Sequence, residues 1–177
     1  VAGNFDIDKK PAWLNSIKGR GKRGWAELIA TRESVERILK TTPEKIVEVV
    51  RSKCWAGSML AGAIGFNAHF ANIVAAFYVA TGQDIAHVVE GSQGITSARL
   101  MSDGGLYFSV ALPAIMIGTV GGGTKLKTQT EARNLTKAES AIELAEVLLG
   151  AVLAGELSLI SSLSAQTLAQ THKVLGR

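Results

Sequence analysis

The feature that most constrains the fold is a run of thirty residues, 54–83, without aspartate, glutamate, lysine or arginine. By hydropathy alone this run is a transmembrane candidate. Asn67, His69 and Asn72 lie near its middle, however, and its glycines alternate with alanines in a way that suits close backbone packing. A helix that is apolar on all sides can also form the centre of a soluble domain, with its few polar groups satisfied inside. We therefore predict a buried central helix here.

The composition suits a folded domain. The chain has 177 residues, of which 47% are hydrophobic and 19% charged, so it can bury a core and is not disordered. Its single cysteine, Cys54, excludes an internal disulfide framework and a multi-cysteine metal site, and it favours a reducing compartment. Because the first residue is valine, we expect further sequence before it.

Before the uncharged run, the pattern predicts a strand and two helices. Residues 22–30 suggest the strand, and a helix is expected from Thr31 to near Lys40. Thr42-Pro43-Glu44 then offers an N-cap, a proline at the first helical position and an acid in the first turn, which predicts a helix through Val50.

After the run, the pattern predicts a hairpin and a helical last third. Residues 94–101 and 105–112 form the expected hairpin, with Ser102-Asp103-Gly104 as its turn. Thr136-x-x-Glu139 reads as a capping box before a long apolar helix. Residues 147–165 read as a second buried helix, although Glu156 interrupts them. The expected fold is mixed α/β (α+β), with a buried central helix, surrounding helices and a small antiparallel sheet.

The positive charge is concentrated in the first third. Residues 1–53 carry a net charge of +5, while residues 54–177 carry −1. Residues 9–26 contain six basic side chains and no acidic one. Such a field favours an anionic partner, although a solvated basic loop gives the same pattern. Nucleic acid is disfavoured because Trp13 and Trp25 flank the cluster without a repeated aromatic and basic pattern.

Two charged places could carry chemistry. The adjacent lysines of Asp8-Lys9-Lys10-Pro11 could bind a dianion, or one of them could act at a carbonyl if a carboxylate held it charged; a solvated pair is the simpler interpretation. Asp84 is the first charge after the uncharged run, and it is either a turn residue or a partner for a lysine.

Two further places are less specific. The glycine-rich segment 118–124 could bind phosphate through its backbone N–H groups or could form a tight turn, and it matches neither a Walker A loop nor a dinucleotide fingerprint. His172 could serve as a general acid or could be a structural or surface residue, and no spacing around it supports a metal site.

Four segments together resemble class I 3-hydroxy-3-methylglutaryl-CoA (HMG-CoA) reductases, in the C-terminal half of the catalytic region. They are AGNFDIDKKPAWLNSIKGRGK, GFNAHFANIVAAFYVATGQD, ALPAIMIGTVGGGT and AGELSLISSLSAQTLAQTHK, in the family's order. The resemblance implies a reduction of HMG-CoA to mevalonate and CoA by two NADPH. It also implies a homodimer or higher homo-oligomer with shared active sites. The location that it implies is the cytoplasm, without membrane contact from this segment.

The resemblance assigns catalytic roles to three residues. Lys9 would stabilise the oxyanion on the reacting carbonyl. Asp84 would pair with Lys9 and favour its protonated form. His172 would protonate the departing CoA thiolate.

The resemblance also assigns binding roles. The residues matched to substrate contacts are Asn4, Lys10, Lys53, Asn72 and Leu159, with Lys40 as a candidate for CoA phosphate and Asp8 shaping the loop. The residues matched to the nicotinamide cofactor are Thr119, Val120, Gly121 and Gly122.

Departures from the family limit what these residues do alone. The family's ENVIG-like glutamate motif and DAMGMN-like cofactor motif are absent, and Ala2 replaces the usual serine before Gly3. Residues 1–12 would be the loop that leaves an inserted cofactor domain, and 13–177 part of the large substrate-binding domain. We therefore expect this segment alone to be inactive. The alternatives are a non-catalytic module that binds acyl-CoA or another anion, and a small membrane protein built on residues 54–83.

Overall fold

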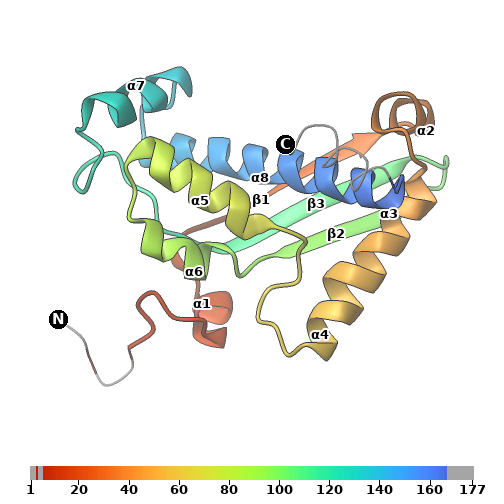
Figure 1. The fold of residues 1–177 in the computed structure, drawn as a ribbon, viewed down its shortest axis with the longest axis horizontal. Coiled ribbons are helices and arrows are strands. Elements are labelled where there is room, and N and C mark those ends of the chain that lie inside the picture. The colour runs from red at the N-terminus through yellow and green to blue at the C-terminus, as the bar shows by residue number, and fades with distance from the viewer. Residues whose placement is uncertain (1–2, 4–5, 167–177) are drawn as a thin grey trace, which may run out of the picture.

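The fold is a small antiparallel sheet covered on one face by helices. The computed structural model describes Gly3 and residues 6–166. Within these residues, three strands are ordered β1-β3-β2. The long helix α8 packs across β1 and β3, and α3 packs against β2 and α8 (Figure 1). The mixed fold with a small antiparallel sheet that the sequence predicts is confirmed.

The strands agree with the predicted positions. They are β1 (Arg20–Ala30), β2 (Ile95–Leu100) and β3 (Leu106–Ile115). The hairpin pairs Leu100 with Leu106 and Ile95 with Ala111, and β1 runs antiparallel to β3 on its other side. Alternating apolar residues of β3, such as Phe108, Val110 and Leu112, are buried beneath the helices.

The short helices agree with the predicted N-cap at Thr42 and with the helix expected to begin at Thr31. Thr31 accepts from the N–H of Ser34, and Thr42 accepts from that of Lys45. The helices are α1 (Trp13–Lys18), α2 (Arg32–Ser34), the π-helical turn η1 (Val35–Leu39), α3 (Pro43–Val49), the π-helical η2 (Val50–Gly57), α4 (Ser58–Leu60), α5 (Phe70–Thr81), the 3₁₀ turn η3 (Ile85–His87), α6 (Val88–Gly91), α7 (Lys127–Leu135) and α8 (Ala141–Ser164).

The prediction of one buried helix over residues 54–83 is wrong. The run contains the end of η2, then α4, a non-helical segment over 61–69, and α5. Gly62 ends the first helix with a φ of 68°, and Phe66 forms a parallel bridge to Ile95 at the edge of the sheet. Only one face of α5 is buried, through Phe70, Val74 and Tyr78, and Val79 is exposed. An absence of charge therefore did not mean burial on all sides.

The longest helix is α8, and its N-cap differs from the predicted one. Thr136 lies after α7, and α8 begins after Ser140, which accepts from the N–H of Glu143. The Glu143 carboxylate in turn accepts from the N–H of Glu139. Ser140-x-x-Glu143 fits the capping-box pattern as well as the predicted Thr136-x-x-Glu139 does, and the helix begins at the later of the two. The predicted helix over 147–165 is confirmed as the larger part of α8.

By length and composition, α8 is also long and apolar enough to cross a membrane, and 33% of its most apolar window is buried within the chain. The core helix of a soluble domain meets the same criterion. In the structure, Leu144, Leu148 and Val152 of α8 belong to the core formed with the sheet. Its length and hydropathy therefore do not assign α8 to either environment.

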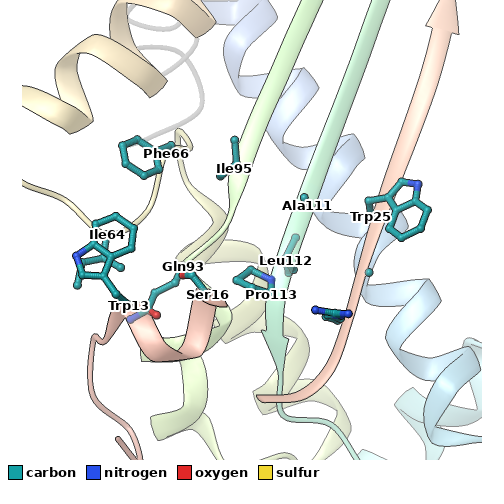
Figure 2. A pocket seen from close by; sticks show the side chains of 12 residues that line it. Trp13, Ser16, Trp25, Ile64, Phe66, Gln93, Ile95, Ala111, Leu112 and Pro113 are labelled. Carbon is teal, nitrogen blue, oxygen red and sulfur yellow. The ribbon is translucent and has the colours of Figure 1, made fainter. Parts of the chain in front are cut away.

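The other face of the sheet is open and partly apolar. Trp25, Ala111 and Ile95 lie opposite one another across the three strands, and the Trp25 side chain is 72% exposed. A hollow of about 340 Å³ lies between this row and Trp13, beside Phe66 (Figure 2). Among the described residues, none of those that the resemblance assigns to the site lines this hollow.

The corrected N-cap of α8 gives a test of stability. Ser140→Ala removes the side-chain acceptor for a helical N–H, so we expect the free energy of unfolding to fall by about 1 kcal/mol. Ser158→Ala, at an exposed position of the same helix, should change it by less than about 0.5 kcal/mol. Urea unfolding followed by circular dichroism measures both values, and equal effects would contradict the assignment.

Candidate functional site

An ion pair joins two residues that are far apart in the sequence. Lys9 lies in the loop before α1, and Asp84 lies between α5 and α6 at the start of η3. The Lys9 Nζ is 2.9 Å from Asp84 Oδ2. Asp84 also caps η3, because its other oxygen accepts from the N–H of Ala86 at 3.0 Å. The structure thus brings together the lysine and the aspartate that the resemblance pairs.

This pair favours the ionised form of both partners. The hydrogen bond to Asp84 raises the pKa of the Lys9 amine, and the same bond lowers the pKa of the Asp84 carboxyl. The Lys9 side chain is 40% exposed, so a ligand can reach its ammonium group. The arrangement presents a fixed positive charge at an accessible surface.

A buried carboxylate that the sequence analysis overlooked lies behind the pair. Glu90 of α6 has no exposed surface. Its Oε1 accepts from the backbone N–H of Lys9 at 2.6 Å and from Arg20 Nη1 at 3.3 Å. Arg20 also binds Asp8, at 2.5 Å. The available signal was a glutamate within a short apolar segment, but nothing in the sequence showed that it was buried.

The same cluster has some features of a metal site. Asp8, His87 and Glu90 offer ligand atoms within 4.8 Å of one another. Arg20 already contacts both carboxylates, so a guanidinium supplies the positive charge that a cation would bring. We therefore assign no metal to this cluster.

The glycine-rich segment 118–124 lies against the residues that precede Asp84. Gln83 donates to the carbonyl of Gly118 at 3.0 Å and accepts from its N–H at 2.9 Å. Gly82 has a φ of 73°, and a Cβ there would lie 2.5 Å from the carbonyl of Gly123. This contact requires glycine at position 82 and fixes the loop beside the ion pair.

The four residues assigned to the cofactor belong to this loop. Thr119 is anchored, because its carbonyl accepts from Arg133 Nη1 at 2.7 Å. Val120, Gly121 and Gly122 are exposed. Nothing lies within 4 Å of the position of a Cβ on Gly121, so a ligand could approach the backbone closely at this point.

A wide hollow of about 800 Å³ adjoins the Lys9 loop. Pro11, Asn67, Asn72 and Val88 are among its lining residues. The second buried carboxylate, Glu156 of α8, fixes the rim, because it accepts from the N–H groups of residues 68 and 69 and from Thr96 Oγ1. The polar groups in the uncharged run therefore serve to shape a recess.

The other assigned substrate residues are placed differently. Lys10 is exposed and its Nζ lies 2.6 Å from Asp6. Lys53 is exposed on η2, and Leu159 is half-buried on α8. Lys40 follows η1, which comes after α2 and the C-terminal end of β1, whereas Arg20 begins β1. Among the described residues, no contact brings Lys40, Lys53 or Leu159 to Lys9. Asn4 and His172 lie outside the described residues.

The single cysteine is not a nucleophile of this site. Cys54 has no exposed surface, and burial raises the pKa of its thiol to about 12.

Comparisons with known proteins find similarity along the whole chain. The family model described as hydroxymethylglutaryl-coenzyme A reductase matches residues 1–177. The chain is 51% identical to the 3-hydroxy-3-methylglutaryl-coenzyme A reductases of Pyrococcus abyssi and Methanocaldococcus jannaschii. It is 46% identical to 3-hydroxy-3-methylglutaryl-coenzyme A reductase 2 of Gossypium hirsutum.

Each alignment covers 100% of this chain but only 45%, 44% and 30% of these relatives, in the same order. The chain therefore spans less than half the length of the relatives it matches. With a family model that matches all of its residues, the chain belongs to the hydroxymethylglutaryl-coenzyme A reductase family.

Proposed function

We propose that the complete gene product carrying this chain reduces HMG-CoA to mevalonate and free CoA. Two hydrides and two protons convert the thioester into a primary alcohol and a thiol. Two molecules of NADPH, when bound, would supply one hydride each. Family membership supports this reaction, and the Lys9–Asp84 ion pair is the observation in this chain that carries it.

The chemistry needs a positive charge where the carbonyl oxygen becomes negative. Each hydride addition turns the carbonyl oxygen into an alkoxide, which a fixed cation stabilises more strongly than it stabilises the neutral carbonyl. Lys9 supplies this cation, because Asp84 orients its ammonium group at 2.9 Å and keeps it protonated. Its exposed fraction leaves room for the carbonyl beside Asp84.

The neighbouring recess suits the acyl part of the substrate. The 800 Å³ hollow lies against the Lys9 loop through Pro11 and contains Asn72 on its wall. We assign Asn72 and Lys10 to the hydroxyl and carboxylate groups of the hydroxymethylglutaryl part. Asn4, Lys53 and Leu159 remain predicted contacts of the same ligand.

The glycine-rich loop fits an approach by the nicotinamide ring. Exposed backbone at Gly121 and Gly122 lies on the loop that Gln83 fixes beside Asp84. A flat ring can approach such a backbone without meeting a side chain. We assign Thr119, Val120, Gly121 and Gly122 to cofactor contact, and His172 to protonation of the CoA thiolate.

We also propose a homo-oligomer whose copies share active sites. Lys40 is assigned to CoA phosphate, yet in one copy it follows η1, after the C-terminal end of β1, and no contact among the described residues brings it to Lys9. A second copy could bring an equivalent lysine to the site. The cytoplasmic location of this segment remains a prediction.

The oxyanion role predicts the effect of removing the lysine. We expect Lys9→Ala in the complete gene product to lower kcat by about 100-fold or more while leaving the fold intact. HMG-CoA-dependent oxidation of NADPH measures turnover, and circular dichroism checks the fold. Lys45→Ala, an exposed lysine on α3, is the matched control and should retain activity. A Lys9→Ala rate above about a tenth of wild type would contradict the role.

The ion pair also predicts a change in pH dependence. Asp84 raises the pKa of Lys9, so Asp84→Asn should lower that pKa and move the alkaline limb of kcat/KM to lower pH. The asparagine oxygen can still cap η3, which limits the structural effect of the substitution. The pH profile of HMG-CoA reduction by the two proteins measures this shift. An alkaline limb at the same pH in both proteins would show that Asp84 does not set the charge of Lys9.

A further inference from the structure

The backbone of Lys9 has an uncommon conformation that needs support. Its φ is 56°, in the left-handed region that residues with a side chain seldom adopt. The loop around it is only partly buried, and the side chains of Lys9 and Lys10 are both exposed. Among the described residues, the hydrogen bond that Lys9 N–H donates is to Glu90, at 2.6 Å. This contact spans 81 positions of the sequence.

The Glu90 carboxylate is itself firmly held. It has no exposed surface, and Arg20 lies 3.3 Å from its Oε1. His87 Nδ1 lies 3.3 Å from Oε2. A buried carboxylate without such partners would be costly, so this one is tied to its place by the groups around it.

Asp84, His87 and Glu90 are spaced three residues apart through η3 and α6. This spacing places them along one side of a continuous helical segment. His87 lies between the two carboxylates, 3.8 Å from Asp84 and 3.3 Å from Glu90. One carboxylate of the segment binds the side chain of Lys9, and the other binds its backbone.

We propose that Glu90 is a positioning residue, which fixes the backbone of Lys9 so that its ammonium group stays against Asp84. Its effect on the reaction rests on the proposed function; its effect on the geometry of Lys9 does not. Glu90 does not contact substrate in this assignment and acts through Lys9 alone. To hold the Lys9 backbone, Glu90 must supply a hydrogen-bond acceptor at Oε1, and this acceptor matters more than the negative charge of the carboxylate.

Two substitutions separate the acceptor from the charge. Glu90→Gln keeps an oxygen acceptor at the same reach, while Glu90→Met keeps a similar length without an acceptor. Both remove the negative charge, so they change the electrostatic field at Lys9 equally. Arg20 keeps its contact with Asp8 in both variants, so its guanidinium retains a partner.

The first readout is turnover of HMG-CoA by the complete gene product. A displacement of about 1 Å at a catalytic group costs on the order of 100-fold in rate, so Glu90→Met should lower kcat by about this factor. KM for HMG-CoA should change much less, because Lys9 acts on the developing charge. Glu90→Gln should stay within about tenfold of wild type.

The second readout is the chemical reactivity of Lys9, and it needs no substrate. Acetylation by acetic anhydride across a pH series, read by mass spectrometry, reports the pKa and exposure of each lysine. The charged groups facing Lys9 are Asp8, Asp84 and Glu90. Losing the acceptor should loosen the contact with Asp84, so Lys9 should be acetylated faster and at lower pH in Glu90→Met than in Glu90→Gln.

Two controls accompany the acetylation measurement. Lys10 pairs with Asp6, so its reactivity should be equal in all proteins. Glu156→Met removes the other fully buried glutamate, which binds residues 68, 69 and 96 and, within the part of the chain that the structure describes, does not contact Lys9. If loss of any buried carboxylate acted by general loosening, this variant would also change Lys9. We expect Lys9 to react there as in wild type.

Each outcome decides the proposal. Equal reactivity of Lys9 in Glu90→Met and Glu90→Gln would overturn it, as would a change of the same size in Glu90→Met and Glu156→Met. If Glu90→Met does not fold, Glu90→Gln decides alone: Lys9 reactivity above that of an exposed lysine such as Lys45 overturns the proposal, and reactivity below it supports it. If the wild-type protein does not turn over HMG-CoA, the proposed function is refuted. The acetylation result still tests the positioning role in that case.

Discussion

The structure around the candidate site depends on burying two carboxylates. Glu90 and Glu156 have no exposed surface, and each must therefore receive hydrogen bonds from inside the chain. Both take them partly from backbone N–H groups, at residue 9 and at residues 68 and 69. Because these donors belong to irregular segments, the buried charges decide where two loops lie. The sheet and α8 supply the rigid frame on which this happens.

The two loops fixed in this way form neighbouring parts of one surface. The loop held by Glu90 carries Lys9, and the segment held by Glu156 lines the 800 Å³ recess through Asn67. The turn after α5 connects them to the glycine-rich loop, since Gln83 binds Gly118 twice next to Asp84. Hydrogen bonds therefore fix the Lys9 cation, the recess and the exposed glycine backbone relative to one another. A reaction between two bound ligands requires such a fixed arrangement.

Prediction from the sequence succeeded where the signal was local. Each successful prediction depends on residues within a few positions: the hairpin turn, the helix start at Thr31, the N-cap at Thr42 and the strand over 22–30. It failed for the central helix, because counting charges over 54–83 ignored how Gly62 and Asn67 break the chain. It chose the wrong capping box because Thr136 and Ser140 both satisfy the local rule. Glu90 was overlooked because burial is not a local property.

The sequence by itself determined the elements, the basic first third and, through its four family motifs, the family and the pairing of Lys9 with Asp84. Tertiary structure alone decided which charges are buried and which backbone groups they hold. The physical reason is that water solvates an exposed carboxylate, so it needs no partner from the chain. A buried carboxylate needs hydrogen-bond donors, and the fold supplies them from residues that are distant in the sequence. Glu90 and Lys9 meet across 81 positions for that reason.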